Sequence, residues 1–460
     1  MSKTQHAGEY KLLNCKIVSS RGVVADIDTK VIGIQIYENL FSQSLIASMT
    51  IIDNTNMVMK LPIIGQEYII LKIENPGIGE IDFTQNVFAV TNVKTRQDVS
   101  NDTQIYDLSL VSTESLRNSR TRVSKSYNGS VSSIVTSILR DENLINTNKD
   151  IYVDKTSNSR KFVAPNIRPF RFIRNLTREA TSGEFEGSPH YYFFENCKGF
   201  QFRCLDGLYK RTPKGSFVAD SESIINQENK SPSSDLEKDY RRILQFSVSR
   251  TNDTLLTTMG GMLGSNLIKY NIFHKNYQTY NFNYFKNFNR FGRIDKNPIY
   301  NKVSIDEQDN TVGDFSDARI HLHPTSSNGL SDTQYYDTDI GYTYSDNHAE
   351  EWLLSRRSKM IEVSSGGLQV QLKVHGYCNI AVGEKINLSL PISGKDHKNV
   401  KDDEFYKGEF LVTQLRHTFA QDERRHTMLM NVVKDSIPAE FNNVANSSEP
   451  VNAKSQIINY

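Results

Sequence analysis

The 460-residue chain is long enough for roughly two to four domains, and its 54 Lys and Arg balance 53 Asp and Glu. The net charge of +1 argues against a nucleic-acid coat protein and against an acidic interaction tail. No apolar run approaches the roughly 18 residues of a membrane-spanning helix, and residues 1–10 offer no apolar stretch for a secretion signal.

Residues 9–115 are predicted to form one strand after another. The runs VIGIQIYENLFSQSLIASMTIID and LPIIGQEYIILKI are rich in Ile and repeatedly interrupted by turn residues, which argues against helices. The segments DNTN and NPGIG have the composition of turns between strands. We therefore predict a first small antiparallel β-barrel over residues 1–115.

The hydrophobic period changes to a helical one at about Asn128. Ser130 is a candidate N-cap for a helix with apolar residues at helical spacing: Val131, Ile134, Ile138 and Leu139. Pro169 marks the start of a second helix, whose apolar stripe is Phe172, Ile173, Leu176 and Ala180. A hairpin around Lys198 and Gly199 follows, so we predict an α/β module.

This module is basic. Residues 116–180 contain 13 Lys or Arg and 5 Asp or Glu, whereas residues 1–115 contain 9 and 13. The basic surface could face a phosphate or an acidic partner, or it could be a solvated face.

The remaining segments complete the expected organisation. Residues 216–238 have the composition of a polar linker, residues 275–345 are rich in Asn, Tyr, Phe and Asp, and a helix with Asn347 as N-cap follows. The predicted domains are a first barrel at 1–115, an α/β module and linker at 116–235, a second barrel at 236–274 plus 364–438, an irregular insertion and helix at 275–363, and a flexible tail at 439–460.

Two stretches near opposite ends of the chain share one strand pattern. Gly65 with Glu67 corresponds to Gly383 with Lys385, Phe88-x-Val90-Thr91 corresponds to Phe410-x-Val412-Thr413, and Tyr106 corresponds to His426. A strand at residues 45–53 precedes the first stretch, and one at 368–376 precedes the second. We infer a duplicated barrel, the alternative being that short apolar strands look alike. The structural motif comprises Gly65, Glu67, Phe88, Thr91, Tyr106, Gly383, Lys385, Phe410, Thr413 and His417.

The sequence lacks familiar catalytic patterns: no G-x-S-x-G, no phosphate-binding Gly loop, no H-E-x-x-H and no G-x-G-x-x-G. We therefore expect no catalytic residue, no cofactor and no metal. His321 and His323 are two residues apart, so a strand would place both on one face, as metal ligands can be; the further candidate ligands are Asp314, Asp317 and His348. We interpret all five as polar loop residues. Glu184 with Glu186, or Asp402 with Asp403, could form the carboxylate pair of a glycosidase, but acidic residues are common in loops.

Single residues are given structural roles. His417, at the end of the strand at 410–416, is expected to bond a backbone carbonyl or a neighbouring side chain. Trp352 is expected to pack against the second barrel. The four cysteines, at positions 15, 197, 204 and 378, fit neither a zinc spacing nor a disulfide framework, so we expect reduced structural thiols and assembly in a cytoplasm.

As an ordered series, these segments resemble the central baseplate hub protein of contractile-tailed phages, in the lineage of the T-even hub and its marine relatives, and are similar to the hub portion of type VI secretion spikes. The resembling segments span residues 8–230 and 350–438. They are IYENLFSQSLIASMTIIDN with LPIIGQEYIILKI, RVSKSYNGSVSSIVTSIL, APNIRPFRFIRNLTREA with YYFFENCKGFQF, and VHGYCNIAVGEKINLSLP with DDEFYKGEFLVTQLRHTF and VVKDS.

The resemblance implies a homotrimer whose six barrels form a pseudo-sixfold ring between a sixfold tail tube and a threefold central spike. It implies no active site, and a lumen through which the tape-measure protein and the genome DNA pass without specific binding. Tail tube or tube-initiator proteins and baseplate wedge proteins are further expected partners. The location would be the virion baseplate, with assembly in the host cytoplasm and no membrane insertion. The alternatives are a spike-type secretion hub, a tail-associated cell-wall hydrolase and an unrelated multi-barrel binding protein.

Overall fold

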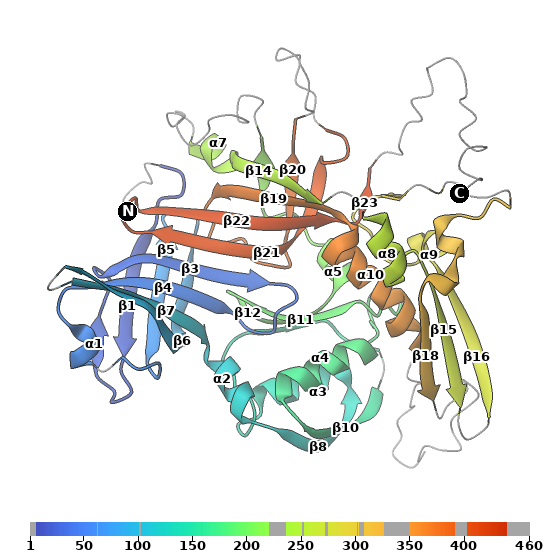
Figure 1. Cartoon of the computed structure of the whole chain (residues 1–460), viewed down its shortest axis with the longest axis horizontal. Coiled ribbons are helices and arrows are strands. Elements are labelled where there is room, and N and C mark those ends of the chain that lie inside the picture. The colour runs from blue at the N-terminus through green and yellow to red at the C-terminus, as the bar shows by residue number, and fades with distance from the viewer. Residues whose placement is uncertain are drawn as a thin grey trace. The chain divides into compact units, whose positions relative to one another are not determined.

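The computed structural model describes residues 6–61, 63–100, 103–157, 159–219, 236–250, 253–271, 275–300, 302, 308–325, 349–391 and 403–438. The fold is mainly β, with large antiparallel sheets and several short helices, as predicted (Figure 1). Contacts divide the described residues into two compact units. One contains residues up to 249 with 369–433, and the other contains residues 250–325, 349–368 and 434–438. Among the described residues, no helix is long and apolar enough to cross a membrane.

The first half of the main sheet comes from residues 11–112. Its strands are β1 (Lys11–Val18), β2 (Val24–Asp26), β3 (Val31–Asn39), β4 (Ile46–Asp53), β5 (Tyr68–Asn75), β6 (Gly79–Ser100) and β7 (Thr103–Ser112), with a short helix α1 (Met57–Lys60). The hydrogen-bonded order is β3-β4-β7-β6-β5-β1-β2. Buried and more exposed residues alternate along β4 and β5, which confirms the period-2 prediction and places Ile51, Leu71 and Phe88 in one apolar core.

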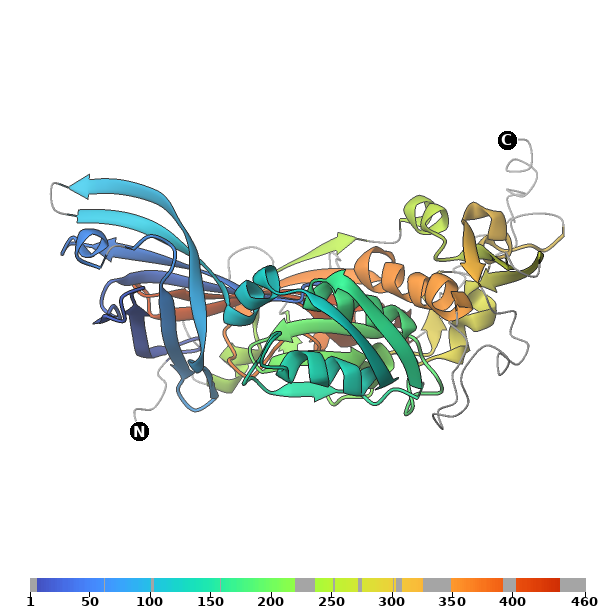
Figure 2. The same cartoon turned by 90° about the horizontal axis from the view of Figure 1, so that it is seen from below.

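The turn between β6 and β7 is shorter than the sequence suggested. Residues 96–104 are mostly polar and would suit a long turn, but β6 extends to Ser100 and β7 begins at Thr103. Residues 94–100 are exposed, so polar side chains are compatible with strand geometry there. In Figure 2 this long hairpin, in light blue, extends away from the neighbouring strands.

The second half of the main sheet repeats the first. Its strands are β13 (Ser216–Val218), β14 (Ile243–Arg250), β19 (Leu368–His375), β20 (Lys385–Ser389), β21 (Gly408–Ala420) and β22 (Arg425–Lys434). A short helix, α7 (Leu236–Arg241), precedes β14. The order β14-β19-β22-β21-β20 matches β3-β4-β7-β6-β5, whereas the outer strands differ, since β13 pairs with β20 in parallel and β1 pairs with β5 antiparallel. Two copies of one strand order, at opposite ends of the chain, therefore stand side by side.

Strand β21 joins the two halves. Its first residues pair with β20, from Leu388↔Gly408 to Lys385↔Leu411, and its later residues pair with β3, from Gln414↔Asn39 to Ala420↔Gly33. Figure 1 shows β21 and β22 alongside β3 and β4. The described strands thus form one continuous sheet on an open path from β14 to β2, and closure of either half into a barrel is not recorded in this part of the chain.

The predicted α/β module is present in the same unit. It contains α2 (Thr113–Arg120), β8 (Val123–Ser130), α3 (Val131–Arg140), β9 (Ile151–Val153), β10 (Ser159–Ile167), α4 (Pro169–Glu179), β11 (Tyr191–Asn196), β12 (Gly199–Cys204) and α5 (Leu205–Tyr209). The Ser130 hydroxyl accepts a hydrogen bond from the Ser133 N–H, and Pro169 is the first residue of α4, which confirms both predicted helix starts. The predicted hairpin is β11 with β12.

Buried ion pairs attach the module to the sheet. Lys149 Nζ lies 2.6 Å from Glu114 Oε2 and 2.6 Å from Glu195 Oε1. Glu195 Oε2 accepts hydrogen bonds from the Leu45 N–H and the Ser112 hydroxyl, both at 2.8 Å. Lys149 thus pairs with both Glu114 and Glu195, and Glu195 in turn binds Leu45 and Ser112 at the ends of β4 and β7.

The second unit carries its own small sheet, in the order β16-β15-β18. Its elements are α8 (Thr254–Gly260), β15 (Gly264–Asn271), β16 (Asn276–Asn283), α9 (Tyr284–Asn287), η2 (Phe288–Arg290), β17 (Asn297–Pro298), η3 (Val312–Asp314), η4 (Ser316–Ala318), β18 (Ile320–Thr325), the helix η7 (Glu351–Ser355), α10 (Arg356–Ile361) and η8 (Glu362–Gly366), and β23 (Ser436–Ile437). The helix predicted near residue 350 is thus present, while its proposed cap Asn347 and the tail at 439–460 lie outside the described residues.

The second unit differs from the expectation in two respects. Residues 264–271 were expected in the second barrel, but β15 pairs with β16 and β18 instead of the main sheet. Residues 276–283 were expected to be irregular and form a strand. Local pattern identifies a strand but not its partner. In β16 the Tyr, Thr and Phe residues favour a strand, and most of its positions are exposed and so accept polar residues.

Candidate functional site

The two sheet halves share a β-bulge at equivalent threonines. In the first half the register shifts between Val90↔Leu110 and Asn92↔Ser109, so Thr91 is the extra residue, and its hydroxyl donates to the Ser109 carbonyl at 3.1 Å. In the second half the register shifts between Val412↔Val432 and Gln414↔Asn431. There Thr413 is the extra residue, and its hydroxyl donates to the Asn431 carbonyl at 3.0 Å. The structure thus places Thr91 and Thr413 at the same position of the repeat.

The two phenylalanines of the motif are also equivalent. Phe88 lies opposite Ile69 of β5, and Phe410 lies opposite Ile386 of β20. Both rings are fully buried, so each anchors the inner face of its half.

Both glycines of the repeat have a positive φ, +94° at Gly65 and +86° at Gly383. The alignment of their neighbours is corrected by one residue. Tyr68 lies opposite Ala89 and Lys385 lies opposite Leu411, which makes Glu67 equivalent to Glu384 and not to Lys385. The reason is that the second loop is one residue shorter between its glycine and the strand.

The equivalent glutamates have the same local function. The Glu67 carboxylate accepts hydrogen bonds from the N–H groups of Ile64, Gly65 and Gln66, and the Glu384 carboxylate accepts one from the Ala381 N–H. Each therefore fixes the loop before its strand. The Lys385 side chain pairs instead with Glu409.

The predicted correspondence of Tyr106 with His426 is wrong by two residues. Ser109 is equivalent to Asn431, and counting along the paired strands makes Tyr106 equivalent to Met428. The long β6–β7 hairpin explains the error, because it adds residues between the bulge and the returning strand. Tyr106 is fully buried, and burial raises the pKa of its hydroxyl.

His417 bonds a neighbouring side chain, as predicted. Its Nδ1 lies 3.0 Å from Nε2 of His426, whose Nδ1 lies 2.9 Å from Oδ1 of Asn75. Burial lowers the pKa of His417 to about 3, so the ring is neutral. Its Nε2 is buried without a hydrogen-bond partner.

The exposed edge of β6 is the clearest candidate for an assembly interface. Beyond Val90, the edge of β6 that faces away from β7 has no partner strand among the described residues. The equivalent stretch of β21, which begins at Gln414, pairs with β3. In turn β14, the equivalent of β3, is the last strand in the sheet order. The chain therefore satisfies one such junction internally and presents the two complementary edges of another.

The other residues considered in the sequence do not converge on a site. His323 packs edge-to-face on Trp352, with ring centroids 5.4 Å apart. Asp314 caps its own turn through Thr311 and pairs with Lys286. In the described part of the chain, no metal-ligand group includes either residue. His348 and Asp402 lie outside the described residues.

This arrangement, two like sheet halves fused edge to edge beside an α/β module, is a tail-protein fold. The tail protein from Neisseria meningitidis MC58 superposes with a TM-score of 0.50 and 8% identity, over 93% of this chain and 98% of that one. The 43 kDa tail protein of prophage MuSo2 from Shewanella oneidensis gives 0.49 and 7%, over 92% and 98%. A component of the E. coli type VI secretion system gives 0.43 and 11%, over 94% and 79%.

Sequence comparison adds nothing to this assignment. No family model matches the chain, and no curated protein matches it. The fold is therefore shown by structure alone.

Proposed function

We propose that this protein is the structural baseplate hub of a phage contractile tail, in which three copies form a pseudo-sixfold ring. The observation that carries the proposal is the junction between β21 and β3 inside one chain. If β6 of one copy pairs with β14 of the next as β21 pairs with β3, the same junction recurs at every half. A ring of three chains then contains six similar halves.

The proposed ring adapts the sixfold tail tube to the threefold central spike and forms part of the conduit for the tape-measure protein and the DNA. The central spike, tube or tube-initiator proteins and baseplate wedge proteins are its proposed partners. The two sheet halves, the first at 11–112 and the second comprising β13, β14 and β19 to β22, would line the ring, and the chain would have no enzymatic activity. The fold shared with the Neisseria tail protein supports a role in a tail.

An exposed strand edge such as that of β6 suits such an assembly. Main-chain groups at an edge are a template for pairing with another chain, and in a ring each edge is covered by a neighbour. On β6 the available stretch is long, since residues 94–100 are exposed and pair only with β7 among described strands.

The proposal is tested by solution mass and by cross-linking. Light scattering on the purified protein, alone and with its candidate spike, should give a mass near three times 52.5 kDa in at least one condition. Cysteines placed in pairs, K94C or R96C with Q245C or S247C, should form disulfides between chains, because paired strands bring Cα atoms to about 5 Å.

Single-cysteine variants are the matched controls and should remain uncross-linked. A mass of one chain in both conditions, with no covalent oligomer from any of the four pairs, would refute the ring. A trimer that none of the pairs cross-links would refute the β6–β14 junction.

A further inference from the structure

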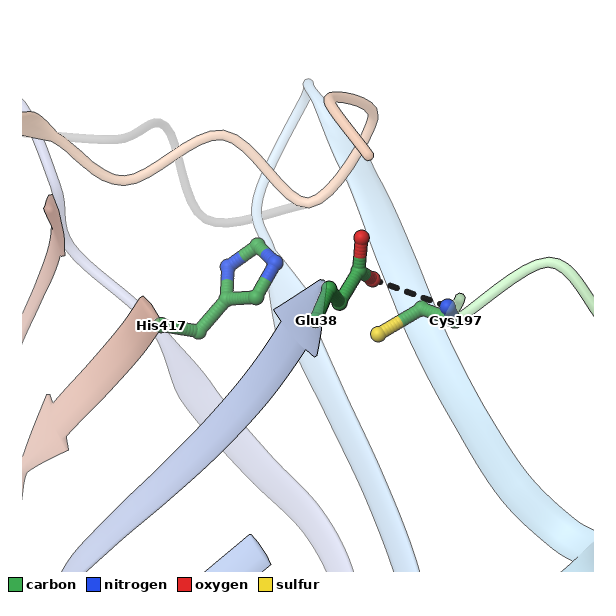
Figure 3. Close-up of side chains that lie close together, drawn as sticks. All are labelled: Glu38, Cys197 and His417. Atoms are coloured by element: carbon green, nitrogen blue, oxygen red, sulfur yellow. Dashed lines mark hydrogen bonds between the residues drawn. The ribbon is translucent and has the colours of Figure 1, made fainter. Parts of the chain in front are cut away.

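Three side chains that are distant in the sequence meet at the junction between the sheet halves. Glu38 is the second-last residue of β3, Cys197 lies in the β11–β12 turn, and His417 is on β21 (Figure 3). One ligand atom of each lies within 4.8 Å of the others. Glu38 is 2% exposed and His417 is fully buried. An oxygen, a sulfur and a nitrogen donor thus face one small space.

The Glu38 carboxylate is buried without a cationic partner. Its Oε1 accepts a hydrogen bond from the Cys197 N–H at 2.8 Å, and its Oε2 accepts one from the Val382 N–H at 2.7 Å. No ion pair with Glu38 is recorded among the described residues, and the nearby Glu384 carboxylate adds negative charge. Burial raises the pKa of the Glu38 carboxyl, whereas the hydrogen bonds from the Cys197 side chain and from the Val382 and Cys197 N–H groups act to lower it. A buried carboxylate of this kind is stabilised by a cation.

The hydrogen-bond chain behind His417 leaves its Nε2 as a free acceptor. The Asn75 amide donates from Nδ2 to the Glu9 carbonyl at 2.9 Å, which orients Oδ1 toward His426. Because that oxygen only accepts, His426 Nδ1 must be the donor and its Nε2 the acceptor. His417 then donates from Nδ1 to His426, and its own Nε2 carries a lone pair with no donor.

Histidines that bind metals show this pattern, since one ring nitrogen binds the ion and the other donates to a neighbour that fixes the ring. Here the neighbour is His426, itself held by Asn75. The thiol of Cys197 completes a donor set of soft sulfur, imidazole nitrogen and carboxylate oxygen, which suits Zn²⁺.

We propose that Glu38, Cys197 and His417 bind a divalent transition metal ion, with zinc as the best fit. A thiolate and a carboxylate together balance the two charges of the ion, so the occupied site would be neutral in the core. Tetrahedral zinc places such ligand atoms about 3.3–3.6 Å apart, so side-chain movements of about an ångström would close the group around it. Water would fill the fourth position.

The ion would hold together three segments that are far apart in the chain. Glu38 lies opposite Leu415 and His417 lies opposite Ile36, so both ligands are within the β3–β21 ladder. Cys197 brings the α/β module to the same point. The site would therefore fasten the module to the junction of the two halves.

The test uses the full chain, purified without a histidine tag and dialysed against trace zinc. Mass spectrometry of metals should find about one zinc per chain. After removal of zinc and addition of Co²⁺, a thiolate-to-cobalt charge-transfer band in the near ultraviolet should appear. The band should be lost in C197S and retained in C204S, a matched change of another buried thiol.

Metal content below about a tenth of an ion per chain in folded protein loaded with zinc would overturn the proposal. A cobalt band that survives in C197S, or one lost equally in C204S, would also overturn it. If C197S fails to fold, thiol alkylation of the wild-type protein tests the site instead. Zinc should protect one thiol from alkylation at Cys197, as identified by peptide mapping, and no protection at that residue would refute the site.

Discussion

The buried lysine that joins the α/β module to the sheet gives a quantitative test of how the first unit is held together. In Lys149→Met, the carboxylates of Glu114 and Glu195 lose the cation that lies 2.6 Å from each. Their side chains are only 6% and 1% exposed, so water cannot replace the lysine. Removing one partner of a buried ion pair destabilises a protein by about 3–5 kcal/mol.

Thermal unfolding is the assay. At roughly 2 °C per kcal/mol for a unit of this size, we expect the transition of the first unit to fall by about 6–10 °C. The matched control is Lys60→Met at the exposed end of α1, where a shift below about 1 °C is expected. The double variant K149M/E114Q should recover part of the loss, because it leaves one buried carboxylate instead of two.

The same variant predicts a pH dependence. In the wild type, burial acts to raise the pKa of both carboxyls, and Lys149 overcomes this at Glu114 but not at Glu195. Without Lys149, both folded-state pKa values should lie above the unfolded value of about 4.3. A raised carboxyl pKa destabilises the fold above that pH, so the gap between variant and wild type should shrink as pH falls from 8 to 5. A gap below about 1 kcal/mol at pH 8, or one that widens on acidification, would refute the reasoning.

Three further outcomes are expected. Gly383→Val should lower stability and trimer yield more than Gly65→Val. Both glycines have a positive φ, but a Cβ added at Gly383 would lie 2.8 Å from the Phe194 ring, whereas one added at Gly65 would lie 3.3 Å from a carbonyl oxygen. Equal and normal trimer yields in the two variants would contradict this. Burial alone would raise the pKa of Asp435, but Lys359 and Arg293 lower it to about 2. The stabilisation of the fold by the Asp435 carboxylate should therefore be present above about pH 4 and be lost toward pH 2. Unfolding measured against pH should show the stability difference between D435N and wild type closing over that range. The assembled ring should not retard duplex DNA at physiological salt, because residues 1–115 carry 9 basic and 13 acidic residues, and tight binding would contradict a non-adhesive lumen.

Local sequence was sufficient for elements and for the repeat. The alternation in β4 and β5, the Ser130 cap and Pro169 at a helix start each depend on neighbouring residues only. The equivalence of Thr91 with Thr413 could be recognised because the F-x-V-T pattern and the bulge occur within one strand. The register on the adjacent strand β7, at Tyr106, could not be recognised, because the longer β6–β7 hairpin changes the number of residues between the bulge and Tyr106.

The sequence could not show which residues and strands far apart in the chain lie next to each other in the fold. Glu38 is 159 residues from Cys197, and neither pattern around them resembles a metal motif. Pairing of β21 with β3 likewise depends on which edges remain after each half has formed. The one local signal for the buried group was Glu38 itself, an acidic residue in a strand otherwise rich in Ile.

The seam between the two sheet halves has an evolutionary consequence. Because β21 and β3 are joined through peptide groups, the junction is largely indifferent to which side chains occupy it. Selection can then preserve the seam while nearly every residue along it drifts, and the two halves of one chain can diverge from each other as freely as from distant proteins. Such an architecture tolerates wide change in sequence, as the fold shared with the Neisseria tail protein at 8% identity illustrates.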